Sequence, residues 1–457
     1  MNPEDFHLFT ESGTSFLLHI PSSIYFELDE IAHTFFQLLK EGSTPTEAHH
    51  QLVTKFSQKE ADEMLEEFLK FEKEAAQIKR PFKPSTEITS ISLNVAQECN
   101  LGCIYCYGQE GTYGSKGLMS TKVGEASVDF LFDKLINARD CSVGFFGGEP
   151  LLNFQLIKEL VPYAVERAES YGKNVHFTIT TNGTLLTDKV INFLNDNKIG
   201  VVISIDGPRE IQDHNRPFKN GNGSYDVIYP TVEKLLETRN GKVTARSTAV
   251  CDNHYYPVFN HLVDMGFRQV HIEPATGMTF NTESIISDYQ KTMKDIMETV
   301  KERRHVLFSN FSDLMGKTYL TTKRYHGCGA GLRYMGISTK GDVYVCHRFV
   351  GVPDFSMGTV WDFNPELQEK ISENTVDKRT LCSECWARYY CGGGCIYEAY
   401  FYNRDITKPY ENRCDLFRSA LKLSIWLYSQ LKEEDQTILD DMYEKYTRDY
   451  IKKDNHY

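Results

Sequence analysis

Residues 1–80 carry the hydrophobic pattern of a small unit in which short strands precede three helices. Apolar runs at residues 16–20 and 24–28 predict two strands joined by a short turn. The helical stretches behind them are amphipathic, and the second and third begin with capping boxes at Thr44 and Ser57. This order indicates a winged-helix unit, and the two prolines within residues 79–85 mark a linker after it.

From about residue 88, short β-rich runs alternate with helical stretches, which is typical of repeated βα units. Six strands are predicted, at residues 91–95, 142–146, 175–180, 201–205, 243–250 and 269–272. Right-handed crossovers would wind them into an open or partial barrel, with functional groups at the carboxyl ends of the strands. The expected fold class is therefore α/β, with a partial, TIM-like (β/α)6 barrel.

The last part of the chain has a different pattern. Residues 283–304 predict a long charged connecting helix, and beyond Cys328 the chain becomes rich in loops and cysteines. This indicates a third unit that metal rather than a large core stabilises, closed by a helix at residues 415–431. The domains we expect are residues 1–80, 88–305 and 306–457.

Composition narrows the possible functions. Of the 457 residues, 41% are hydrophobic and 25% charged, as in ordinary globular proteins, and the net charge of −13 would repel nucleic acid from most of the surface. Neither a signal-peptide pattern nor an apolar run of about 18 residues is present, so we expect a soluble cytoplasmic protein without a membrane partner.

The chain contains 12 cysteines, too many for small core residues alone. A reducing compartment argues against disulfides, so metal binding is the leading explanation. Cys141 and Cys251 stand apart in strand-like contexts, and we expect both to be buried apolar residues. The remaining cysteines fall into an early and a late group.

The early group follows the first predicted barrel strand as Cys99, Cys103 and Cys106, with the spacing CX3CX2C. Three thiolates from one loop hold three irons of a 4Fe-4S cluster and leave the fourth iron open for chemistry. The alternative is a zinc site that a distant ligand completes. The second predicted strand runs into Gly147-Gly148-Glu149-Pro150, where two glycines permit close approach of a ligand and a carboxylate is available for an ammonium group.

These motifs resemble those of the radical S-adenosylmethionine (SAM) enzymes, over residues 88–275 or so. In that family the open iron chelates SAM, whose reductive cleavage yields a radical that abstracts a substrate hydrogen. The resemblance implies that Cys99, Cys103 and Cys106 bind the cluster and that Gly147, Gly148, Glu149 and Pro150 receive the methionyl ammonium. It also implies that Tyr105 lies near the adenine and that Ser204 and Arg216 hold the methionyl carboxylate. Residues 181–184 fit either the ligand pocket or a plain turn with a helix cap.

Taken alone, four of the late cysteines, Cys382, Cys385, Cys391 and Cys395, fit a zinc ribbon. The seven late cysteines together do not divide into complete tetrahedral zinc sites. Their order resembles the SPASM extension of peptide-modifying radical enzymes, which holds two auxiliary 4Fe-4S clusters, making three clusters in all. By this resemblance one auxiliary cluster is bound by Cys382, Cys385, Cys391 and Cys414, and the other by Cys328, Cys346 and Cys395. Tyr334 stands where some members have an eighth cysteine, so one iron of the second cluster could take a substrate thiolate unless a side chain such as His326 closes it.

The N-terminal unit resembles the winged-helix precursor recognition element, in which a leader peptide adds a strand to a sheet edge. The alternative is a plain stabilising domain. Together the units predict an enzyme that forms thioether crosslinks in a ribosomally made precursor peptide, supplied with electrons by a reductant such as flavodoxin or ferredoxin. A general base is not assignable from the sequence.

Three other functions are kept open. Carbon–carbon crosslinking uses the same architecture, and a sulfatase-maturing enzyme would resemble the barrel and SPASM parts. The latter type places an Asp after the second SPASM cysteine, where this chain has His347. The alternative outside enzymes is an iron–sulfur electron-transfer or peptide-binding protein.

Overall fold

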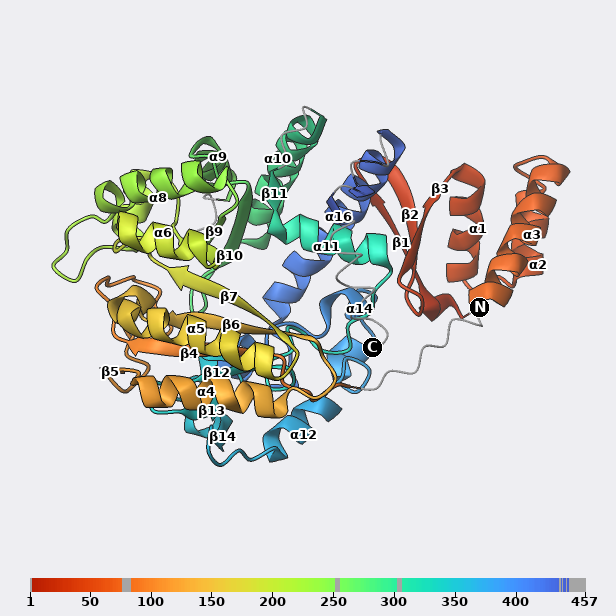
Figure 1. Ribbon diagram of the computed structural model, residues 1–457. Helices are drawn as coiled ribbons and strands as arrows, with labels where there is room; N and C mark the ends of the chain where they lie inside the picture. Colours follow the sequence, from red (N-terminus) through yellow and green to blue (C-terminus); the bar gives the residue numbers. More distant parts are fainter. Residues whose placement is uncertain are drawn as a thin grey trace.

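The computed structural model describes residues 2–75, 84–250, 255–301, 306–434, 437, 439–440 and 442–443. Most of the expected linker, residues 79–83, and Cys251 lie outside these residues. An N-terminal unit packs beside a larger body built around one long curved sheet (Figure 1).

The N-terminal unit is a three-stranded antiparallel sheet followed by three helices. Its elements are β1 (Phe6–Glu11), β2 (Thr14–His19), β3 (Ile24–Leu28), α1 (Glu30–Lys40), α2 (Pro45–Leu52) and α3 (Gln58–Ala75). The sequence predicted two of the strands and all three helices. It missed β1, because apolar and polar residues do not alternate regularly along this segment.

The two faces of this small sheet have different partners because successive strand residues point to opposite faces. Phe6 and Leu17 pack with α1–α3 in a core of their own, whereas Phe9, Phe16 and Leu18 belong to the core of the larger body. Figure 1 shows the same arrangement, with α1–α3 on one side of the sheet and α16 (Glu411–Glu434) on the other. The apolar run at residues 16–20 is therefore buried on both faces.

The larger body confirms the six predicted barrel strands, which are parallel to one another in the sheet. They are β4 (Ser90–Gln97), β6 (Asp140–Gly147), β7 (Asn174–Thr181), β8 (Gly200–Ser204), β9 (Thr244–Ala249) and β10 (Gln269–Pro274). The helices between and behind them are α4 (Thr121–Lys134), α5 (Phe154–Ser170), α6 (Asp188–Asp196), α7 (Arg209–Asn215), α8 (Tyr225–Arg239), α9 (Tyr255–Asp264) and α10 (Thr282–Lys301). In the described chain the strand order runs from β11 (Leu307–Phe308) through β10, β9, β8, β7, β6 and β4, so the barrel is open.

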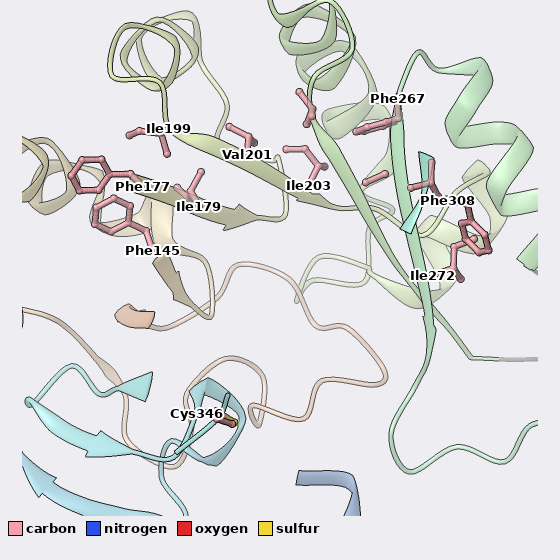
Figure 2. Close-up of a cluster of buried hydrophobic side chains, with 14 of the residues drawn as sticks. Phe145, Phe177, Ile179, Ile199, Val201, Ile203, Phe267, Ile272, Phe308 and Cys346 are labelled. Carbon is pink, nitrogen blue, oxygen red and sulfur yellow. The ribbon is translucent and has the colours of Figure 1, made fainter. Parts of the chain in front are cut away.

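One side of the barrel sheet is a continuous hydrophobic core. Val201, Ile203 and Ile272 lie in it together with aromatic residues such as Phe145 and Phe177, as Figure 2 shows. Helix residues of α6, α8 and α9 belong to the same core, so this is the helix-covered face. The opposite face of the sheet is left for the functional groups.

The C-terminal part extends the barrel sheet. β12 (Tyr334–Ile337) pairs in parallel with β4 and continues into β13 (Asp342–Tyr344) and β14 (Ser356–Thr359). Around this extension lie β5 (Gly117–Leu118), α11 (Ser309–Leu320), α12 (Glu366–Glu373), α13 (Thr380–Ser383), α14 (Arg388–Cys391) and α15 (Ile396–Asn403). Pairing of β12 with β4 places the late cysteines beside the strand that carries the early ones. Within the described ranges, none of the helices has the length and apolar content to cross a membrane.

Candidate active site and metal centres

The early cysteines lie on the loop that leaves β4 at its carboxyl end. Two hydrogen bonds hold this loop against the end of α7 and the residues that follow it: Gly102 N to Pro217 O at 2.8 Å and Ile104 N to Asn215 O at 3.0 Å. Burial raises the pKa of Cys99 to about 11, and the charge of Cys103 adds to the shift. Burial also raises the pKa of Cys103, to which the charge of Cys106 contributes. Each of the three thiols therefore lies near enough to a neighbouring one to influence its charge.

The backbone of Gly147 and Gly148 lies directly against the start of this loop. Gly148 N donates to Ala96 O and Glu149 N to Glu98 O, both at 2.8 Å. A Cβ on Gly147 would lie 2.2 Å from Ala96 O, and one on Gly148 would lie 2.2 Å from Glu98 O. Only glycine permits such a close approach, so the end of β6 presents bare backbone beside the cysteines.

The carboxylate of Glu149 is fully buried and already engaged. It accepts hydrogen bonds from Thr181 Oγ1 at 2.7 Å, Asn182 N at 2.8 Å and Leu151 N at 3.0 Å. Asn182 in turn donates to Asn100 Oδ1 at 2.9 Å on the cysteine loop. The sequence interpretation offered this carboxylate to an ammonium group, whereas the structure uses it to join β6, β7 and the loop. Residues 181–182 thus belong to the site.

Tyr105, Asp206 and Arg216 form a second buried group behind the cysteines. The Tyr105 hydroxyl donates to Asp206 Oδ2 at 2.8 Å and accepts from Arg216 at 2.6 Å. Burial raises the pKa of Asp206, while the Arg216 guanidinium acts in the opposite direction. In the described part of the chain Arg216 Nε has no hydrogen-bond partner, so a donor remains for a ligand. Ser204 lies at the carboxyl end of β8, two positions before Asp206.

The four cysteines assigned to the first auxiliary site line one cavity of about 440 Å³. They come from α13, the loop behind it, the end of α14 and the start of α16: Cys382, Cys385, Cys391 and Cys414. Burial raises the pKa of Cys414 to about 12, and the charges of the other three members contribute. Cys395 also lines this cavity, and a lining so rich in thiols fits an iron–sulfur cluster.

The remaining three late cysteines form a separate group. Burial raises the pKa of Cys346, and the charges of Cys328 and Cys395 raise it further. The side chain of His326 lies against Ser372 O, at 3.1 Å from Nε2. Tyr334 is paired with His347, whose Nδ1 lies 2.5 Å from the hydroxyl oxygen.

The described residues contain no group of three or more His, Cys, Asp and Glu side chains arranged for a single metal ion. Cluster binding by the cysteine groups, and the number of clusters, stay predictions.

Sequence reasoning missed the side chains that join the early cysteine loop to the three-cysteine group. The Tyr107 ring directly follows Cys106 and lies 6.0 Å from Tyr397 and 6.2 Å from His347, centroid to centroid. Arg348 lies over both tyrosine rings, at 5.0 Å from Tyr107 and 4.2 Å from Tyr397, and its guanidinium approaches Cys395 Sγ to 3.7 Å. In the sequence, these residues are marked only by following a cysteine of one of the groups by one or two positions.

An open parallel barrel with a three-thiol loop behind its first strand defines a class of iron–sulfur enzymes. Residues 93–254 match the radical SAM superfamily. An uncharacterised protein of Methanocaldococcus jannaschii is 39% identical over 291 residues, which cover 61% of this chain and 91% of that protein. The chain therefore belongs to the radical SAM superfamily. Membership implies a 4Fe-4S cluster and SAM, and the early thiols, the bare Gly147–Gly148 backbone and the free Arg216 donor fit them.

Two further relatives are named as a radical SAM synthase and a sulfatase-maturating enzyme. The radical SAM cyclopropyl synthase TigE of Paramaledivibacter caminithermalis is 24% identical, covering 77% of this chain and 75% of that enzyme. The serine-type anaerobic sulfatase-maturating enzyme of Bacteroides thetaiotaomicron is 25% identical, covering 66% of this chain and 80% of that enzyme. The chain is thus a radical SAM enzyme related to maturases.

Two solved structures share the fold. Native anSMEcpe with bound AdoMet has a TM-score of 0.65 at 19% identity and covers 76% of this chain and 100% of its own. Streptococcus suis SuiB bound to its precursor peptide SuiA has a TM-score of 0.52 at 17% identity, covering 89% of this chain and 97% of its own. The α/β partial barrel expected from the sequence is confirmed.

Proposed function

We propose that this enzyme modifies a ribosomally made precursor peptide and forms thioether bonds between a cysteine sulfur and a carbon of another residue. The observation that carries the proposal is the incomplete three-cysteine group, Cys328, Cys346 and Cys395, which Tyr107 and Arg348 join to the early cysteine loop. A bound iron there would have a position for a sulfur ligand, because iron in thiolate sites favours sulfur.

The protein side chains have distinct tasks in this proposal. Cys99, Cys103 and Cys106 hold the cluster, the Gly147–Gly148 backbone lies beside bound SAM, and Arg216 with Ser204 takes its carboxylate. The bound cluster and SAM would supply one-electron cleavage of SAM and hydrogen abstraction, and the late cysteines would hold an acceptor for the electron that thioether formation releases. Tyr107, Tyr397 and Arg348 pack between the two cysteine groups and exclude water from the reacting atoms.

The N-terminal unit offers a place for the leader peptide. Within the described chain β3 pairs with β2 alone, so its outer edge is free to pair with an added strand. Residues 23–27 of this edge line a groove of about 530 Å³, whose other wall includes Tyr319, Tyr428 and Lys432. An extended peptide in the groove would gain main-chain hydrogen bonds from β3 and side-chain contacts from α16.

The second candidate is sulfatase maturation, which the named relatives favour. His347 argues against this candidate, because the sulfatase-maturing type places an Asp at that position. In this chain His347 is instead paired with Tyr334, at 2.5 Å. The two candidates act on different peptides and leave different products.

The test uses the anaerobically reconstituted enzyme with a strong reductant, SAM and the cysteine-containing peptide encoded nearest to the gene. We expect 5′-deoxyadenosine to form and the peptide to lose two hydrogens together with the iodoacetamide reactivity of its cysteine. Loss of hydrogens with a cysteine that still reacts would indicate carbon–carbon crosslinking instead. Absence of 5′-deoxyadenosine would contradict the enzyme function itself.

A further inference from the structure

The inner face of the barrel sheet carries a row of polar side chains. Arg246 on β9 is in register with Ser204 on β8 and with His271 on β10. Neighbours in register on parallel strands share a face, so the three side chains project from the same side of the sheet. The next residue, Ser247, is buried on the helix-covered face, whereas Arg246 is exposed. The guanidinium therefore stands on the open, inner side of the barrel.

Three guanidinium groups meet in this region, and two of them have acceptors. Arg413 pairs with Glu273 and, at 3.2 Å, with Glu398. Arg348 donates to Thr276 Oγ1 at 2.5 Å and approaches Cys395 Sγ. The Arg246 side chain has neither a hydrogen bond nor an ion pair to any residue that the structure describes, although its backbone carbonyl accepts from Ile205 N. The adjacent carboxylate, Glu273, is already shared by Arg413 and His271.

The surroundings of Arg246 show which side of the site it faces. The side chain is open to solvent on this side, and the charged groups that act on its guanidinium are Glu273, Arg348, Tyr107 and Arg413. These residues lie toward the late cysteines. The groups that act on Arg216 are instead Cys103, Tyr105 and Asp206, at the proposed SAM position. The two arginines therefore serve different parts of the site.

A solvent-accessible guanidinium that has no acceptor in the described part of the protein is free to pair with a ligand entering the barrel. A carboxylate is its best complement, since the two form paired charge-assisted hydrogen bonds. We propose that Arg246 binds the carboxylate of an aspartate or glutamate side chain of the substrate peptide and so selects an acidic residue for the space between the two cysteine groups. This inference rests on the proposed peptide substrate and adds the chemical class of the residue that enters the barrel.

The test measures binding to the anaerobically reconstituted holoenzyme with SAM present, by calorimetry at low ionic strength. The probes are two capped peptides, acetyl-Gly-Cys-Gly-Asp-Gly-amide and its Asn counterpart. We expect the Asp peptide to bind the unaltered enzyme at least about tenfold more tightly. Arg246→Gln should abolish this preference and Arg246→Lys should keep part of it. Arg268→Gln removes the same charge just before β10 and should keep all of it.

The possible outcomes separate the sources of the carboxylate. Equal binding of both peptides to the unaltered enzyme, or no binding of either, overturns the inference, as does a preference that survives Arg246→Gln. A loss of SAM affinity in Arg246→Gln without any peptide preference assigns the arginine to SAM and also overturns it. If Arg246→Gln fails to retain iron, the inference is tested by the binding of the two peptides to Arg246→Lys and to the unaltered enzyme. Because binding needs no turnover, an intact Asp preference with no crosslinked product would contradict the proposed function alone.

Discussion

At the scale of single residues, buried polar groups at the barrel mouth are satisfied by partners far away in the chain. Glu149 shows this most clearly, since its carboxylate accepts hydrogen bonds from Thr181 Oγ1 and Asn182 N at the end of β7, besides a local one from Leu151 N. Charge-assisted bonds of this kind are among the stronger contributions to stability, and an unmet buried donor costs free energy. The residue is therefore a brace for the bare Gly147–Gly148 backbone.

We expect Glu149→Gln to lower the free energy of unfolding by about 2–3 kcal/mol, because the amide places an N–H group against donors. Thermal and denaturant unfolding measure the change. The control is Glu98→Gln, whose half-exposed carboxylate lies 3.7 Å from Lys116 and should contribute less than about 1 kcal/mol. Equal stability of the two variants would contradict the role of Glu149 as a brace.

At the scale of elements, the N-terminal sheet attaches to the body through β1. His7 stacks on Trp386 with ring centroids 4.1 Å apart and planes 8° from parallel, and Phe9 lies on the same strand face. Trp386 directly follows Cys385, so this contact joins the proposed leader-binding unit to an auxiliary cysteine group. Burial lowers the pKa of His7 to about 4, and the charge of Lys422 adds to the shift.

This contact should weaken in acid. The folded protein holds His7 neutral to a lower pH than the unfolded chain, where the pKa is about 6.5. Between these values the unfolded chain binds more protons, so stability is lost as pH falls from about 6.5 to about 4. We expect His7→Phe, which keeps the stacked ring, to make the melting temperature fall less steeply over this range. Identical pH dependence in both proteins would contradict the assignment.

At the scale of the whole molecule, packing sorts the cysteines into their groups. β12 pairs with β4, which places the stretch from Cys328 to Cys346 beside the early loop. The start of α16 then brings Cys414 to Cys382, Cys385 and Cys391 around one cavity. The three proposed ligand groups share no cysteine, so we expect each to load separately.

We expect fully loaded enzyme to contain about 12 irons, from three 4Fe-4S clusters. Replacing Cys99, Cys103 and Cys106 by Ala should remove about four irons and abolish SAM cleavage, while the late cysteines keep the rest. Iron and sulfide analysis measures this, with Cys141→Ala as the control because Cys141 is buried at 3% exposure outside the groups. Zinc without inorganic sulfide, or SAM cleavage by the triple variant, would contradict the cluster assignment.

The sequence alone determined the barrel strands, the helices of the N-terminal unit and the chemistry of the early loop, because these depend on local periodicity and on spacing within a few residues. It did not reveal β1, the engagement of Glu149 or the isolation of Arg246. Each of those depends on contacts between residues that are distant in the chain. Phe9 packs in the core of the larger body, Thr181 donates a hydrogen bond to Glu149, and Glu273 pairs with Arg413 rather than with Arg246. Tertiary structure decided them because hydrogen bonds and ion pairs form between whichever groups packing brings within reach, and local pattern does not record that choice.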